Sequence, residues 1–149
     1  GTDIDGALRT LNRLLRRRAV CFLLSDFLTE ESLSWIRPPV REQPGQLRRT
    51  LSLTGRRHDL ICIHLFDRRE LELPPVGWMV LEDAETGDVV ELDTSDPKLR
   101  SLYRHRNHER REQLLQTFRR SGIDHFEVAT GEPYMAALRT FFRKREARR

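Results

Sequence analysis

The chain has 149 residues, of which 38% are hydrophobic and 34% charged, and this balance predicts one folded domain instead of a disordered segment. Its longest purely apolar run is Ala19–Leu24, which is too short to cross a membrane as a helix. No signal-peptide pattern opens the sequence. Cys21 and Cys62 both lie inside apolar runs, and two buried thiols fit a reducing compartment, so we expect a cytoplasmic protein.

The formal net charge of +4 is unevenly distributed. Residues 139–149 hold six basic side chains and one acidic one, so the rest of the chain is nearly neutral. Such a basic tail could bind nucleic acid or anionic lipid. A frayed, charged C-terminus is the simpler explanation of the same residues. Phe141 and Phe142 fit the apolar stripe of a helix better than base-stacking positions, so nucleic acid is not the favoured partner.

The first half of the chain alternates between helical and strand patterns. Residues 2–17 carry apolar side chains at helical spacing, with Thr2 as the expected N-cap and Arg16–Arg18 at the favourable C-terminal end. The apolar runs Ala19–Leu24 and Leu60–Phe66 predict strands covered on both faces, as in a parallel sheet. Between them we expect a short segment around residues 33–36 and a helix around residues 46–57.

The second half begins with a predicted hairpin, Trp78–Leu81 with Val89–Leu92, whose turn contains Gly87. The residues Ser95 to Pro97 then open a long helix that runs to about residue 120. A strand over residues 123–129 follows, and the last helix carries an apolar stripe of Met135, Leu138, Phe141 and Phe142. This order predicts an α/β fold: a parallel three-strand sheet plus a β-hairpin, flanked by helices.

Seven short segments form a recognisable pattern by their order and spacing: Gly1–Ile4, Ser25–Leu28, Arg57–Leu60, Asp67–Pro74, Glu82–Gly87, Leu92–Thr94 and Ser121–Asp124. Together they resemble the von Willebrand factor A-like domains, and within them the bacterial family called domain of unknown function 58. The resemblance covers essentially the whole chain and implies a Rossmann-type domain of which residues 1–149 form the C-terminal part, with residues 139–149 as a basic tail.

The resemblance also implies a divalent metal site at the C-terminal end of the sheet. Such sites use an Asp-x-Ser-x-Ser motif, a Thr and an Asp; Thr2 matches the second and Asp26 the third, whereas the first motif belongs upstream of Gly1. One hydroxyl and one carboxylate are a poor set for magnesium, which takes roughly six oxygens. We therefore expect no tight magnesium binding by this chain alone, although the full-length protein could bind magnesium.

The resemblance also implies that this chain lacks the usual central strand of the sheet. The strand at residues 19–25 would have one unpaired edge, which is a template for pairing with another chain. We expect a homodimer through this edge, or a swapped arrangement.

The candidate residues also have ordinary structural interpretations. Asp26 could cap a loop, Thr2 could be no more than an N-cap, and Asp67 could be a loop residue at the end of its strand. His105 and His108 lie among arginines that repel cations, which favours a solvated helix face over a metal site.

Two functions from different classes fit these observations. The resemblance implies a protein-interaction module and not an enzyme, encoded beside MoxR-type AAA+ ATPases and working with one in complex assembly or chaperone-like maturation. Thr2, Asp26 and Asp67 would form its partner face, and full-length members often carry N-terminal membrane helices. The alternative is a metal-dependent phosphodiester or phosphoryl hydrolase, which needs clustered carboxylates at strand ends such as Asp26 and Asp67.

Overall fold

The computed structural model describes residues 3–28, 46–82, 87 and 89–148. Its elements, in chain order, are α1 (Ile4–Leu14), β1 (Val20–Ser25), α2 (Gln46–Arg57), β2 (Asp59–Phe66), the 3-10 helix η1 (Arg68–Glu70), β3 (Trp78–Glu82), β4 (Val89–Asp93), α3 (Pro97–Arg120), β5 (Asp124–Ala129) and α4 (Tyr134–Glu146). The predicted succession of helices and strands is confirmed. The expected segment around residues 33–36 and most of the predicted hairpin turn lie outside the described residues.

The three strands β1, β2 and β5 form a parallel sheet in the order β1-β2-β5, and β3 and β4 form a separate antiparallel pair. The fold is therefore mixed α/β, with helices flanking the parallel sheet, as the sequence predicted. Because the strands are parallel, their carboxyl ends lie at one edge, where open α/β sheets place their ligands.

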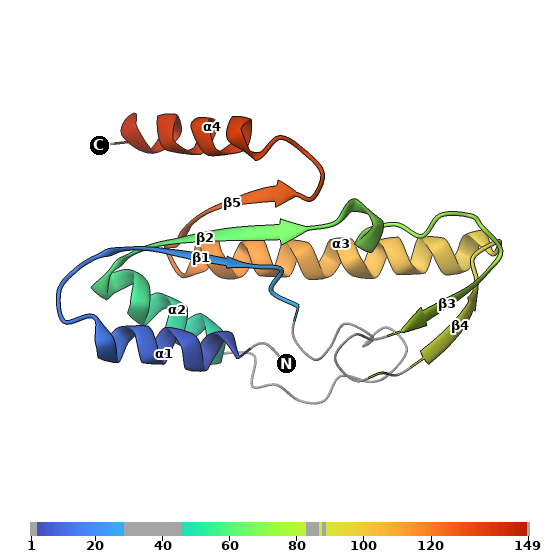
Figure 1. Ribbon diagram of the computed structural model, residues 1–149, viewed down its shortest axis with the longest axis horizontal. Coiled ribbons are helices and arrows are strands. Elements are labelled where there is room, and N and C mark those ends of the chain that lie inside the picture. Colours follow the sequence, from blue (N-terminus) through green and yellow to red (C-terminus); the bar gives the residue numbers. More distant parts are fainter. Residues whose placement is uncertain (1–2, 29–45, 83–86, 88, 149) are drawn as a thin grey trace.

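The main core fills the space between one face of the sheet and the helices α1, α2 and α3, which lie together on that side (Figure 1). Alternate strand residues point toward it, because side chains along a strand alternate between faces. Its buried members are Ile4, Leu8, Cys21, Phe27, Leu51, Leu60, Cys62, Phe118 and Ile123. Both cysteines are buried and free, as their apolar surroundings in the sequence predicted.

The opposite face of the sheet is covered by α4, which runs along β5 (Figure 1). Phe141 of α4 packs on Phe126 of β5, with ring centroids 4.7 Å apart. Arg145 forms ion pairs with Asp59 of β2 and Asp124 of β5. The prediction of a frayed tail is therefore wrong for residues 139–146. These residues belong to α4, which Arg145 fastens to two strands.

The helix α4 is the one described element on this face of the sheet, and its position corrects two predictions. Val20, Phe22 and Leu24 of β1 are 60%, 49% and 57% exposed, so β1 is covered on one face and not on both. The stripe of the last helix is also only partly buried, since Met135 and Phe142 are exposed. Both differences have one cause: α4 packs over β5, and no described element covers this side of β1.

The first helix differs at both ends from the prediction. Asp3 is the N-cap of α1, and its carboxylate accepts a hydrogen bond from the Gly6 backbone N–H at 2.8 Å; the predicted cap, Thr2, lies outside the described residues. The helix ends at Leu14, because Leu15 is already extended. Arg16–Arg18 therefore follow the helix and do not form its last turn.

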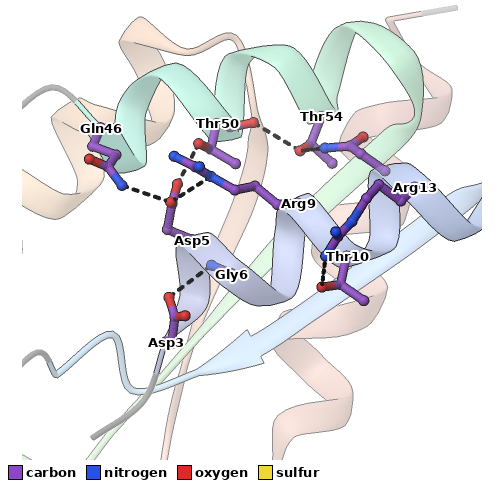
Figure 2. A network of polar contacts seen from close by, with 10 residues as sticks. Asp3, Asp5, Gly6, Arg9, Thr10, Arg13, Gln46, Thr50 and Thr54 are labelled. Carbon is purple, nitrogen blue, oxygen red and sulfur yellow. Dashed lines mark hydrogen bonds and ion pairs between the residues drawn. The ribbon is translucent and has the colours of Figure 1, made fainter.

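A polar network joins α1 to α2 (Figure 2). The carboxylate of Asp5 accepts hydrogen bonds from the Thr50 hydroxyl and from Gln46 Nε2, the latter at 2.9 Å, and pairs with Arg9 Nε at 2.8 Å. The hydrogen bond from Thr50 is the main cause that lowers the pKa of Asp5, followed by the one from Gln46. Farther along the two helices, Asn12 Nδ2 donates to Thr54 Oγ1 at 2.7 Å.

Candidate functional site at the carboxyl edge of the sheet

The carboxyl edge brings together the residues that follow the three parallel strands. Asp26 follows β1, Asp67 follows β2, and Thr130 follows β5. The Thr130 hydroxyl donates to Asp67 Oδ2 at 3.1 Å, and the Thr130 backbone N–H donates to the Phe66 carbonyl at 2.9 Å. The ends of β2 and β5 are thereby tied together.

Asp26 lies in a tight turn that its neighbours hold in place. The Ser25 hydroxyl oxygen accepts a hydrogen bond from the Phe27 N–H at 2.9 Å, and Asp26 Oδ1 accepts one from the Leu28 N–H at 3.1 Å. Phe27 has a φ of 53°, a left-handed conformation that costs a non-glycine residue on the order of 1 kcal/mol or more. Its buried ring packs on Phe118, with centroids 5.0 Å apart, so core packing sustains the strained turn. The carboxylate of Asp26 remains exposed.

Asp67 is half-buried and serves as a helix cap. Its Oδ1 accepts a hydrogen bond from the Arg69 N–H at 2.8 Å, and Glu70 completes a capping box with it around η1. The backbone hydrogen bond from Arg69, together with that from Thr130, lowers the pKa of the Asp67 carboxyl. Both carboxylate oxygens thus accept hydrogen bonds from within the chain, which agrees with the simpler interpretation of Asp67 as a loop residue.

Of the two metal ligands that the family resemblance implies, only Asp26 can be placed, because Thr2 lies outside the described residues. Within the described part of the chain, no three His, Cys, Asp or Glu side chains gather closely enough to hold a metal ion. Asp26 could offer a magnesium ion one exposed carboxylate, of which one oxygen already accepts a hydrogen bond. That donor set alone does not fit an ion that takes roughly six oxygens.

Sequence reasoning missed a partly buried ionic cluster just beneath this edge. Glu127 of β5 accepts two hydrogen bonds from Arg111 of α3, from Nε at 2.8 Å and from Nη2 at 2.6 Å. Its Oε1 also lies 3.0 Å from Nδ1 of His64, on the neighbouring strand β2. The guanidinium of Arg111 lies over the ring of Phe66, 5.3 Å from its centroid, a cation–π contact that helps to hold it.

The Glu127 member of the cluster is ionised at neutral pH. Burial by itself raises the pKa of Glu127, but the hydrogen bonds and charges of His64 and Arg111 outweigh burial and lower the pKa to about 2. An ionised carboxylate only accepts hydrogen bonds. The proton shared with Glu127 therefore resides on His64 Nδ1.

The sequence contained one weak signal of this cluster. His64 is a polar residue in the largely apolar run of β2, where a buried polar group needs a partner. Its pairing with Glu127 depends on the register between β2 and β5, in which the two residues lie opposite each other. That register joins strands 63 residues apart in sequence, and no local pattern predicts it.

A small cavity of about 50 Å³ opens between this cluster and the Asp26 turn. It is lined by Asp26, Phe27, Leu28, His64, Phe66, Glu70, Leu71, Asn107, Arg110, Arg111 and Leu114. Asn107 is buried beside this cavity. The space suits one or two water molecules or the tip of a polar side chain, given the roughly 30 Å³ that one water occupies in the liquid.

The two histidines of α3 occupy a solvated face, as the sequence indicated. Both are exposed, and His105 Nε2 lies 3.3 Å from Glu109 on the next turn. Exposed pairs of this kind contribute little to stability.

None of the described helices is long and apolar enough to span a membrane.

Comparison with known proteins places the chain in a family. The model of the family described as "Protein of unknown function DUF58" matches residues 1–113. The chain is 32% identical over 143 residues to the uncharacterized protein Rv1480 of Mycobacterium tuberculosis, a match that covers 96% of this chain and 40% of the relative. The same figures hold for the uncharacterized protein Mb1516 of Mycobacterium bovis.

A third relative, the uncharacterized protein MAV169 of Mycobacterium avium, is 31% identical over 143 residues, which cover 96% of this chain and 76% of that protein. The chain thus spans about two fifths of the length of the first two relatives. No solved structure matches it significantly. From the family match and these bacterial relatives we conclude that the chain belongs to the DUF58 family.

Proposed function

We propose that this chain is a protein-interaction module that works with a MoxR-type AAA+ ATPase in complex assembly or chaperone-like maturation. The observation that carries the proposal is the exposed Asp26 carboxylate at the carboxyl edge of the sheet, presented on a turn that Phe27 holds in a strained conformation. Strained backbone at such a position is typical of functional sites. The resemblance to von Willebrand factor A-like domains, of which the chain would form the C-terminal part, supports the same interpretation.

In this proposal Asp26 contacts the partner directly, and the family resemblance adds Thr2 and Asp67 to the same partner face. An exposed carboxylate at an interface contributes to specificity and to the rate of association. Magnesium, if the full-length protein binds it, would add to this face through Asp26. We further propose that the open edge of β1 mediates homodimer formation, since β1 pairs with β2 and with no other described strand.

The test is binding of the chain to a MoxR-type ATPase, measured by calorimetry. We expect Asp26→Ala to weaken the complex by about tenfold, the effect of losing a well-placed interfacial residue. The matched control is Glu146→Ala, which removes an exposed carboxylate from the far end of α4.

Two outcomes would contradict the proposal. One is unchanged binding by Asp26→Ala, and the other is no binding by the unaltered chain. Magnesium-dependent hydrolysis of a phosphodiester, abolished by Asp26→Ala, would favour the hydrolase.

A further inference from the structure

The hairpin of β3 and β4 presents a face that combines apolar and acidic side chains. In the register of the pair, Trp78 lies opposite Asp93, Val80 opposite Glu91 and Glu82 opposite Val89. Residues directly opposite each other, and alternate residues along each strand, point to the same side of the sheet. We call this side the hairpin face, and it consists of Trp78, Val80, Glu82, Val89, Glu91 and Asp93.

The apolar residues of the hairpin face are unusually open to solvent. Trp78 is 76% exposed, Val80 64% and Val89 58%. The other side of the hairpin is its inner one, where Leu92 is buried. A cluster of exposed apolar side chains that includes a tryptophan is typical of a surface that binds a partner, because tryptophan is enriched among the residues that dominate binding energy.

The hairpin is anchored firmly at its open end. The buried Thr94 donates from its hydroxyl to the Gly77 carbonyl at 2.6 Å and accepts from the Val76 N–H at 3.1 Å. Arg100 of α3 donates in turn to the Thr94 carbonyl at 2.5 Å. A surface held in this way loses little conformational entropy when it binds.

The charge on the hairpin face identifies the kind of partner. Glu82, Glu91 and Asp93 flank the three apolar residues, and within the described part of the chain the face holds no basic residue. We propose that the hairpin face binds a segment of another protein in which Arg or Lys side chains flank apolar ones. The apolar side chains would pack on Val80 and Val89, and a cation would stack on the exposed ring of Trp78.

The same charges disfavour other partners. Anionic lipid headgroups and nucleic acid phosphates would be repelled by three carboxylates around the apolar centre. The proposal does not rest on the function assigned to Asp26, because the hairpin is a separate sheet that shares no strand with β1, β2 and β5.

The experiment measures binding of two fluorescently labelled peptides, Gly-Arg-Leu-Arg-Leu-Gly and Gly-Glu-Leu-Glu-Leu-Gly, to the whole chain by anisotropy. We expect the arginine peptide to bind more tightly than the glutamate peptide, with an affinity that falls as salt is added. Trp78→Ser should weaken binding of the arginine peptide by about fivefold, and Glu91→Gln should weaken it less.

Two control variants make the test specific. Leu53→Ser removes another exposed apolar side chain, from α2, and should leave the affinity unchanged. The helix α2 lies at the opposite end of the molecule from the hairpin (Figure 1). Asp26→Ala should also leave it unchanged, which separates this site from the proposed partner face. Far-ultraviolet circular dichroism confirms that each variant is folded.

Three results would overturn the proposal. The first is equal binding of the two peptides, and the second is an affinity that Trp78→Ser does not alter. The third is self-association of the chain that Trp78→Ser abolishes in sedimentation equilibrium, which would make a second copy the occupant of the hairpin face.

Discussion

Glu127 accepts hydrogen bonds from Arg111 and His64 beneath the carboxyl edge, and these partners lower its pKa to about 2. A carboxylate whose pKa is lower in the folded state than in the unfolded state stabilises the fold above the unfolded pKa. That contribution is lost as the pH falls through the folded pKa. For Glu127 the loss therefore begins near the ordinary value of 4.5 and is complete near 2.

The variant Glu127→Gln tests this contribution. At about pH 7 we expect it to lower the free energy of unfolding by about 1–3 kcal/mol, because it removes a charged acceptor from three hydrogen bonds. At about pH 3 the difference from the unaltered chain should shrink. Urea unfolding of both proteins at the two pH values measures this difference in free energy. A difference that does not change with pH would contradict the lowered pKa of Glu127.

The control is Glu109→Gln on the exposed face of α3, where Glu109 pairs with His105. Since both partners are largely exposed, we expect this variant to change the free energy of unfolding by no more than about 0.5 kcal/mol.

Asp26 leads to a prediction about magnesium. The one carboxylate that this residue offers, with an oxygen already hydrogen-bonded to Leu28, is a small part of the roughly six oxygens that the ion takes. Calorimetric titration of the chain with magnesium should therefore show no tight binding. Micromolar affinity that is lost in Asp26→Ala would contradict this prediction.

Among the elements, α1 and α2 are joined both by apolar packing in the core and by the hydrogen bonds around Asp5. Thr50 is the buried member of that network and donates to Asp5 from its hydroxyl. Thr50→Val keeps the shape of the side chain and deletes the donor. We expect it to lower the free energy of unfolding by about 1 kcal/mol.

The same chain offers a matched control for this change. Thr10 lies on the outer side of α1, where its hydroxyl accepts from Arg13 at 3.2 Å (Figure 2). Thr10→Val should change stability by less than about 0.5 kcal/mol, because both partners remain solvated. Thermal unfolding of the two variants compares them, and equal effects would show that the network does not stabilise the helix pair.

Local sequence patterns predicted these elements well wherever the decisive interactions are local. The bounds of α2 and the start and end of α3 follow from helical spacing and from the Asp96 and Pro97 start signal. The start of α1 was misplaced, because Thr2 and Asp3 are both good capping residues and a one-residue shift decides between them. The burial of β1 was mispredicted as well, since the cover on each face of a strand comes from elements distant in sequence.

For the whole molecule, the uneven cover of the sheet has the largest consequence. The helix α4 lies over β5, and Val20, Phe22 and Leu24 on β1 remain exposed at the sheet edge (Figure 1). An apolar face beside an open strand edge favours association with another chain.

We predict that the chain is a homodimer at roughly 50 µM, a state that depends on concentration, and that Phe22→Glu converts it to a monomer. Light scattering measures the mass of both. Leu53→Glu, which adds the same charge to an exposed position on α2, should leave the dimer intact. A monomeric unaltered chain would contradict the prediction.

The sequence by itself determined the mixed α/β class, the order of the elements, the buried cysteines and family membership, because spacing, capping residues and short apolar runs act locally or recur among relatives. Only the tertiary structure decided which face of β1 is open, and it brought His64, Glu127 and Arg111 together beneath the carboxyl edge. It also showed that the basic C-terminal segment is a helix fastened to the sheet by Arg145. These features depend on strand register and on helix placement across long stretches of sequence, which the packing of the whole chain sets.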